Sequence, residues 1–161
     1  MKKNTLHFFC GKMAAGKSTL SKELAREYDA VLLCEDEILS TLYPTEISTI
    51  EDYLNYSLRL KVFMKSHVIG LLEKGNSVVM DFPANTPRQR AWFKELYESA
   101  GVEHTLHFLN KSDELCKMQL KKRNKTLPEN APLTSEATFD AMTKFFEAPR
   151  DEEGFNTRTY T

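Results

Sequence analysis

The residues Gly11 to Ser18, with the sequence GKMAAGKS, constrain the fold of this 161-residue chain more than any other segment. They match the pattern GxxxxGK[ST] at every fixed position. The apolar run Leu6 to Phe9 comes before them and predicts a strand over 5–10, whereas Leu20, Leu24 and Tyr28 recur every fourth residue and predict a helix over 17–28. A glycine-rich loop between a strand and a helix is typical of a phosphate-binding loop, or P-loop.

The residue types of this loop suit nucleotide phosphates and Mg²⁺. Glycines let successive backbone N–H groups turn inward around an anion, and the helix N-terminus adds the positive end of its dipole. We expect Lys17 to reach the β- and γ-phosphates and Ser18 to ligate Mg²⁺. The alternative is a strand-to-helix turn with a solvated lysine, which the flanking elements disfavour. The predicted nucleotide contacts are Gly11, Lys12, Met13, Ala14, Ala15, Gly16, Lys17 and Ser18.

Short apolar runs alternate with longer stretches of helical period along the rest of the chain. They predict strands over 30–34, 77–80, 103–109 and within 155–161, and helices over 51–74, 87–100, 112–123 and 135–147. We therefore expect a three-layer α/β fold of the P-loop NTPase kind, with a central, mostly parallel sheet of about five strands. The length is that of one domain, so residues 1–161 are predicted to form a single unit. The proline-containing stretch 124–135 predicts a short lid.

Two helices carry apolar residues at helical spacing, which we interpret as faces turned to the core. In the helix over 51–74 these are Leu54, Leu58, Val62, Ile69 and Leu72. In the last helix they are Phe139, Met142, Phe145 and Phe146. If the core takes up both sets, no exposed apolar stripe remains, and we expect a monomer by default.

Three consecutive acids, Glu35-Asp36-Glu37, follow the second predicted strand directly. In a parallel α/β sheet the carboxyl ends of the strands gather along the ligand crevice, so these acids should lie near the γ-phosphate. A carboxylate there can accept the proton of an acceptor hydroxyl or orient it for in-line attack, and we favour Asp36. The alternative is that Asp36 caps a short helix over 37–42, and both roles can hold together.

Asp81 closes the third predicted strand and is followed by the irregular segment FPANTP. This is the position of a Walker-B-type aspartate, which bonds a magnesium ligand or the P-loop hydroxyl. The alternative is an aspartate that starts the next turn. Asn85, Arg88 and Arg90 are further candidates for the acceptor side.

Arg123 ends a predicted helix just before the lid, where a cation could close over the phosphates. The alternative is that the basic run Lys121 to Arg123 only complements the helix dipole. His104 and His107 do not suggest a metal pair, because a separation of three residues on a strand turns them to opposite faces.

The composition adds limits on partners and location. A formal net charge of −1 gives no global attraction to nucleic acid or to membranes. No run of about 18 apolar residues or signal-peptide core occurs, so we expect a cytoplasmic protein. Cys10, Cys34 and Cys116 are odd in number and lack CxxC spacing, which indicates reduced thiols.

Together these motifs resemble the small P-loop kinase-like ATP-binding proteins related to chloramphenicol phosphotransferase, zeta toxin and the 5′-kinase domains of polynucleotide kinases. Five segments carry the resemblance: the P-loop through Thr19, Cys34 to Leu39 with Leu42-Tyr43, Val78 to Arg90, Leu115 to Asn124, and Phe146 to Pro149 with Glu153 to Phe155. The resemblance spans nearly the whole chain.

The resemblance implies ATP as the nucleotide, with Thr19 and Pro149 on its binding side. It also implies an acceptor-side aspartate at Asp36, an aspartate at Asp81 and a lid arginine at Arg123. Many relatives carry a second arginine four residues before the lid arginine, where this chain has Gln119. The expected function is a kinase that moves the γ-phosphate of ATP to a hydroxyl of a small-molecule or nucleotide-like acceptor. The alternative is a nucleotide-dependent switch with slow hydrolysis.

Overall fold

The computed structural model describes residues 3–129 and 133–161. Within them, five strands form one parallel sheet in the order β2-β3-β1-β4-β5, which confirms the predicted fold class and the last strand. The strands are β1 (Thr5–Gly11), β2 (Val31–Cys34), β3 (Val78–Pro83), β4 (Glu103–Leu109) and β5 (Thr157–Tyr160).

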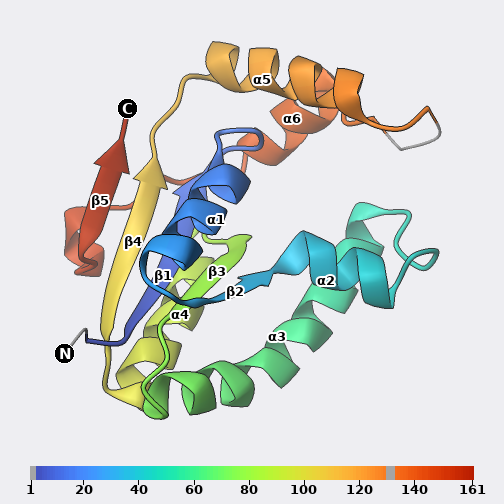
Figure 1. Ribbon diagram of the computed structural model, residues 1–161. Helices are drawn as coiled ribbons and strands as arrows, with labels where there is room; N and C mark the ends of the chain where they lie inside the picture. Colours follow the sequence, from blue (N-terminus) through green and yellow to red (C-terminus); the bar gives the residue numbers. More distant parts are fainter. Residues whose placement is uncertain (1–2, 130–132) are drawn as a thin grey trace.

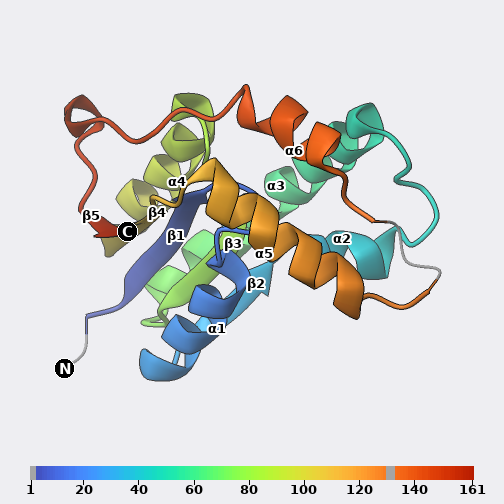
Figure 2. The ribbon, with the colours of Figure 1, turned by 90° about the horizontal axis from the view of Figure 1, so that it is seen from above.

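The helices lie on both faces of the sheet and across its upper edge (Figures 1 and 2). They are α1 (Lys17–Glu27), α2 (Glu35–Leu42), α3 (Ile50–Glu73), α4 (Pro87–Ala100), α5 (Asp113–Thr126) and α6 (Glu136–Thr143), with a 3-10 turn at Asp151–Glu153. α1 covers one face, and α3 and α4 cover the other. α5 and α6 lie above the carboxyl ends of the strands. No helix among the described residues has the length and apolar character needed to cross a membrane.

Alternation along β1 divides the core into two parts, because successive side chains of a strand point to opposite faces. Leu6 and Phe8 pack on the face of α3 and α4, where the ring of Phe8 stacks on Phe93 at 4.7 Å. Phe9 packs on the face of α1 with Leu24. Full burial of each such side chain contributes about 1.5–3 kcal/mol, so this central strand anchors both layers.

Two buried histidines continue the α1 face of the sheet. His7 Nδ1 lies 3.0 Å from His107 Nε2, and His107 Nδ1 lies 2.8 Å from the hydroxyl of Tyr160. Burial lowers the pKa of His7 to about 4. Burial, and then the neighbouring His7, lower the pKa of His107 to about 3. His104 instead stacks on Tyr97 at 3.9 Å on the other face, as its spacing from His107 predicts.

The predicted core face of α3 is wrong in large part. Its buried residues are Ser57, Leu60, Met64, Val68 and Leu72. Leu54, Leu58 and Val62 are 59%, 64% and 73% exposed, and with Ile50 and Phe63 they form an apolar stripe on the surface. The expectation of no exposed stripe is therefore also wrong. The helix carries two apolar rows, and its spacing alone does not distinguish the buried one.

The boundaries around the predicted lid also differ. α5 continues to Thr126, so the first three residues of the segment 124–135 are helical, and residues 130–132 lie outside the described residues. α6 ends at Thr143, four residues before its predicted end, because the chain then turns to bring the N–H of Glu147 to the carbonyl of Asn85 at 2.8 Å. Phe139 is buried as predicted, whereas Met142 and Phe145 are 40% and 72% exposed.

Candidate functional site

The N-terminus of α1 differs from those of the helices that follow it. The side chains of Thr49, Thr86, Ser112 and Ser135 accept hydrogen bonds from the first turns of α3, α4, α5 and α6. α2 has no such cap but has three acidic residues in its first turn. α1 has neither, and its N-cap residue, Gly16, has a φ of 104°. Its first N–H groups and its dipole are therefore available to an anion.

The P-loop, residues 11–18, is tied to three neighbouring segments. The N–H of Gly11 donates to Asn85 Oδ1 at 2.9 Å, and Lys12 Nζ lies 2.7 Å from Asp113 Oδ1 in the first turn of α5. Gly11 also lies against β4, where an added Cβ would meet the Cβ of Leu109 at 3.3 Å. A larger residue would crowd the strand, so packing favours glycine at this position.

Lys17 is the first residue of α1, and its ammonium group donates to the carbonyl oxygen of Gly11. Burial lowers the pKa of Lys17, while the carboxylate of Asp81 acts in the opposite direction. A cation at a helix N-terminus also faces the positive end of the dipole. An anion placed in the loop would relieve both costs, which is the electrostatic condition for phosphate binding.

A cavity of about 90 Å³ lies beside Lys17. Its lining residues are Lys17, Glu35, Asp36, Asp81, Phe82 and Pro83. Asp81 lies within β3, not beyond it, and pairs in register with Cys34, the last residue of β2. This register brings the acids of the two strands together, as the parallel sheet predicts. Burial raises the pKa of Asp81, and the charge of Lys17 opposes that shift.

Glu35 is a site residue that the sequence did not single out from its acidic neighbours. It is 1% exposed, accepts a hydrogen bond from Ser57 Oγ at 2.7 Å and another from the hydroxyl of Tyr53. Burial raises the pKa of Glu35, and the hydrogen bonds from Tyr53 and Ser57 oppose the rise. Tyr53 and Ser57 are four residues apart and so lie on one face of α3, which is the sequence signal for this role.

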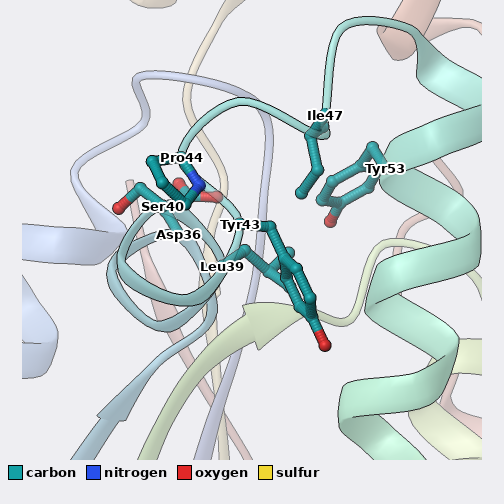
Figure 3. Close-up of a pocket in the computed structure, with 7 residues that line it drawn as sticks. All are labelled: Asp36, Leu39, Ser40, Tyr43, Pro44, Ile47 and Tyr53. Atoms are coloured by element: carbon teal, nitrogen blue, oxygen red, sulfur yellow. The ribbon is translucent and has the colours of Figure 1, made fainter.

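A second pocket, with a volume of about 310 Å³, opens between α2 and the N-terminal part of α3. Its lining residues are Asp36, Leu39, Ser40, Tyr43, Pro44, Ile47 and Tyr53. Figure 3 shows Asp36 and Ser40 on one side of it, with Ile47 and Tyr53 on the other. Asp36 therefore lines both this pocket and the cavity beside Lys17. The capping alternative is wrong, because α2 begins at Glu35 and Cys34 is its N-cap.

A family described as AAA domain matches residues 6–149 of the chain. The chain belongs to this family. The predicted resemblance to small P-loop kinase-like proteins is thereby confirmed at the level of the domain. No curated protein matches this AAA domain.

Solved structures with the same fold include several kinases. A provisionally named kinase from Chloroflexus aurantiacus j-10-fl has a TM-score of 0.74 and 18% identity, over 98% of this chain and 88% of its own. The Mycobacterium tuberculosis APS kinase CysC, in complex with AMPPNP and APS, has a TM-score of 0.57 and 16% identity, over 90% and 98%. Chaetomium thermophilum Kti12, in complex with ADP-AlF3, has a TM-score of 0.65 and 14% identity, over 96% and 88%. At these identities the similarity establishes the fold.

Arg123 lies in the last turn of α5 with an exposed side chain. Neither Lys121 nor the P-loop residue Lys12 is free to take the place of an arginine at position 119, because each is engaged elsewhere. Lys121 Nζ lies 3.1 Å from Glu136 Oε1 in α6, and Lys12 is paired with Asp113. Within the described residues, the side chains of Lys122 and Arg123 are exposed and enter no ion pair.

Two of the three candidates proposed for the acceptor side have a different role in this AAA domain. Asn85 contacts the P-loop, as described above. Arg90 is fully buried, and its guanidinium donates to Glu153 Oε1 at 2.9 Å, to the carbonyl of Ala84 at 3.0 Å and to that of Glu147 at 2.9 Å. These contacts hold the segment around Pro149 against the loop after β3. Arg88, two residues away, is exposed.

Proposed function

We propose that this AAA domain is an ATP-dependent kinase that phosphorylates a hydroxyl group of a small molecule. The observation that supports this most directly is the position of Asp36. Its carboxylate borders the cavity that contains Lys17 and Asp81, and it also borders the larger pocket between α2 and α3. A kinase needs such a group between the phosphate donor and the acceptor, whereas a switch that only senses phosphate does not.

The nucleotide would be held by residues 11–19, with Pro149 on the side of the base. The uncapped α1, the left-handed Gly16 and the buried ammonium group of Lys17 fit triphosphate oxygens. Ser18 and Asp81 are the residues proposed to hold Mg²⁺, which is bound through few protein oxygens with phosphates and water completing its shell. When bound, ATP and Mg²⁺ supply an activated phosphoryl group with much of its charge neutralised.

The chain's own residues would then act on the hydroxyl and on the developing charge. Asp36 accepts the proton of the attacking hydroxyl or holds that hydroxyl in line, and Lys17 stabilises negative charge on the transferred phosphoryl oxygens. Arg123 is proposed to approach the same oxygens as a lid residue. Its exposed position at the end of α5 leaves its side chain free to make that approach.

The test uses γ-labelled ATP, Mg²⁺ and a fractionated extract of small metabolites. Wild type should produce a labelled compound. Asp36→Asn should lower its formation by about 10²–10⁴-fold with ATP binding retained. Lys17→Met should weaken ATP binding itself. Glu37→Gln is the matched control, since Glu37 is an exposed neighbour on α2 and lines neither cavity. Label released only as inorganic phosphate, at a rate that Asp36→Asn does not change, would favour the nucleotide-dependent switch.

A further inference from the structure

The larger pocket carries chemical information about the acceptor. We propose that it takes a neutral or positively charged molecule of about one ring, which places an aromatic or apolar face against Tyr43, Ile47 and Tyr53 and a hydroxyl group at Asp36. This inference rests on the proposed kinase function for the hydroxyl, and on the pocket alone for the class of molecule.

The size of the pocket limits the acceptor first. Its volume of about 310 Å³ is at the lower end of the range of roughly 300–1,000 Å³ typical of small-ligand sites. Two of its walls are fixed in place before any ligand arrives. Tyr43 packs on Tyr56 with ring centroids 4.3 Å apart, and the hydroxyl of Tyr53 donates to the buried Glu35. Rigid aromatic walls favour a flat or apolar body of matching size.

The charge of the pocket limits the acceptor further. Among the residues that the structure describes, no lysine, arginine or histidine lines it. Asp36 lies in its wall, and Glu35 lies behind Tyr53. Lys17 borders the neighbouring cavity, where the phosphates are expected. Lys61 does not line the pocket: it lies over the ring of Trp92, 5.4 Å from its centroid, and its charge acts on Glu35, where it lowers the pKa of that carboxyl. A carboxylate, sulfate or phosphate on the acceptor would therefore meet the charge of Asp36 with no cation among the lining residues to offset it, whereas an ammonium group would meet Asp36 and tyrosine faces.

Three small probes separate the effect of charge from that of shape. Each has a phenyl ring on a three-carbon chain that carries a hydroxyl group, and they differ in charge. They are 3-phenylpropane-1,2-diol, which is neutral, phenylalaninol, which is a cation, and 3-phenyllactate, which is an anion. Ligand-observed NMR on the wild-type protein measures their binding without requiring phosphate transfer. We expect the diol and the amine to bind at least about tenfold more tightly than the lactate.

A charge introduced into the wall tests the location. Ser40→Lys places an ammonium group in the pocket from the exposed surface of α2 and should reverse the preference toward 3-phenyllactate. Thr41→Lys adds the same charge to the next exposed residue, which does not line the pocket, and should leave the wild-type order unchanged. Equal effects of the two substitutions would overturn the proposal, since they would locate binding elsewhere.

The remaining outcomes separate this inference from the proposed function. The assigned acceptor class is overturned if the wild-type protein binds 3-phenyllactate as tightly as the amine, or if it binds none of the three probes. Neither result decides the kinase reaction, because ATP binding and transfer to another acceptor are measured separately. If the probes bind in the expected order but no label moves from γ-labelled ATP to any acceptor, the pocket assignment is supported and the kinase reaction fails.

Discussion

Arg90→Met tests whether the buried guanidinium of Arg90 holds the nucleotide side of the domain together. Arg90 is 0% exposed, and the side chain of Glu153 is 18% exposed. The substitution keeps an unbranched side chain but removes both hydrogen bonds to Glu153, at 2.9 and 3.2 Å, and those to the carbonyls of Ala84 and Glu147. It leaves two carbonyl oxygens without the guanidinium, and it leaves the carboxylate of Glu153 with only the hydrogen bond from the backbone N–H of Arg150.

Removing one member of a buried ion pair costs about 3–5 kcal/mol, because the remaining charge stays desolvated. In a domain of this size each kcal/mol lowers the Tm by about 2–4 °C, so we expect a fall of about 6–20 °C. Urea denaturation followed by circular dichroism measures the free energy of unfolding. The matched control is Arg88→Met, two residues earlier on α4 and exposed, which should stay within about 0.5 kcal/mol of wild type.

The pH dependence identifies the cause of the loss. Burial alone would raise the pKa of Glu153, but the hydrogen bonds from Arg90 and from the backbone N–H of Arg150, with the charges of both arginines, outweigh it and hold that pKa below its ordinary value of 4.5. A carboxylate with a depressed pKa contributes stability above its unfolded pKa and loses it as the pH falls. The gap between wild type and Arg90→Met should therefore narrow below pH 4.5. An Arg90→Met protein as stable as Arg88→Met at neutral pH would refute the reasoning.

Three further predictions rest on single positions. Leu60→Ala should lower the free energy of unfolding, measured by urea denaturation, by about 2–5 kcal/mol, because Leu60 is buried. Leu58→Ala should lower it by less than about 0.5 kcal/mol, because Leu58 is 64% exposed, and equal losses would contradict this orientation of α3. Gly16→Ala should cost about 1–2 kcal/mol and weaken ATP binding in calorimetry, because its φ of 104° disfavours a side chain; unchanged binding would count against the loop geometry. The free energy of unfolding should fall as the pH drops from 6.5 to about 4, by about 1.4 kcal/mol per pH unit for each buried histidine, because the unfolded chain takes up protons that His7 and His107 do not. His7→Leu should remove about half of that slope and the exposed His67→Gln should not change it; a slope that His7→Leu leaves intact would contradict the assignment.

Local sequence patterns predict the phosphate-binding part of the site well, because the residues that form it are close together in the chain. The strand, loop and helix around Gly11 to Ser18 are consecutive in the chain, so the motif and its context are visible together. Asp36 and Asp81 are 45 residues apart in sequence, yet parallel strands meet at one edge, and the register of Cys34 with Asp81 brings them side by side. Here a rule of fold geometry substitutes for a local signal.

The role of Arg90 has no comparable signal. It lies on a helix directly after the polar residues Arg88 and Gln89, and the partners that bury it, Glu147 and Glu153, are 57 and 63 residues later in the chain. Only the folded arrangement shows that an arginine at this position is enclosed. The sequence therefore predicted a polar residue near the site but not the contacts that it makes.

The orientation of α3 was missed for a different physical reason. One face of the helix carries Leu54, Leu58 and Val62, and another carries Leu60, Met64 and Val68. Either row of apolar residues has the spacing that identifies a helix, but which row is buried depends on the elements that pack against it. The buried face also contains Ser57, a polar residue that looks misplaced until its hydrogen bond to Glu35 is known.

The two sides of the site are held by interactions of unequal strength. The P-loop is tied to Asn85, and the adjoining segment is tied to the buried Arg90, so its geometry is set before a nucleotide binds. Beyond Leu120, its last buried residue, α5 is joined to the segment before α6 by two hydrogen bonds between Asn124 and Thr134, at 2.7 and 3.3 Å. It is joined to α6 itself by the ion pair of Lys121 with Glu136, whose side chains are 68% and 49% exposed. Such a pair contributes about 0–1 kcal/mol. The exposed side chain of Arg123 can thus change its rotamer without disturbing either core, whereas a movement of the P-loop would break its part-buried hydrogen bond to Asn85.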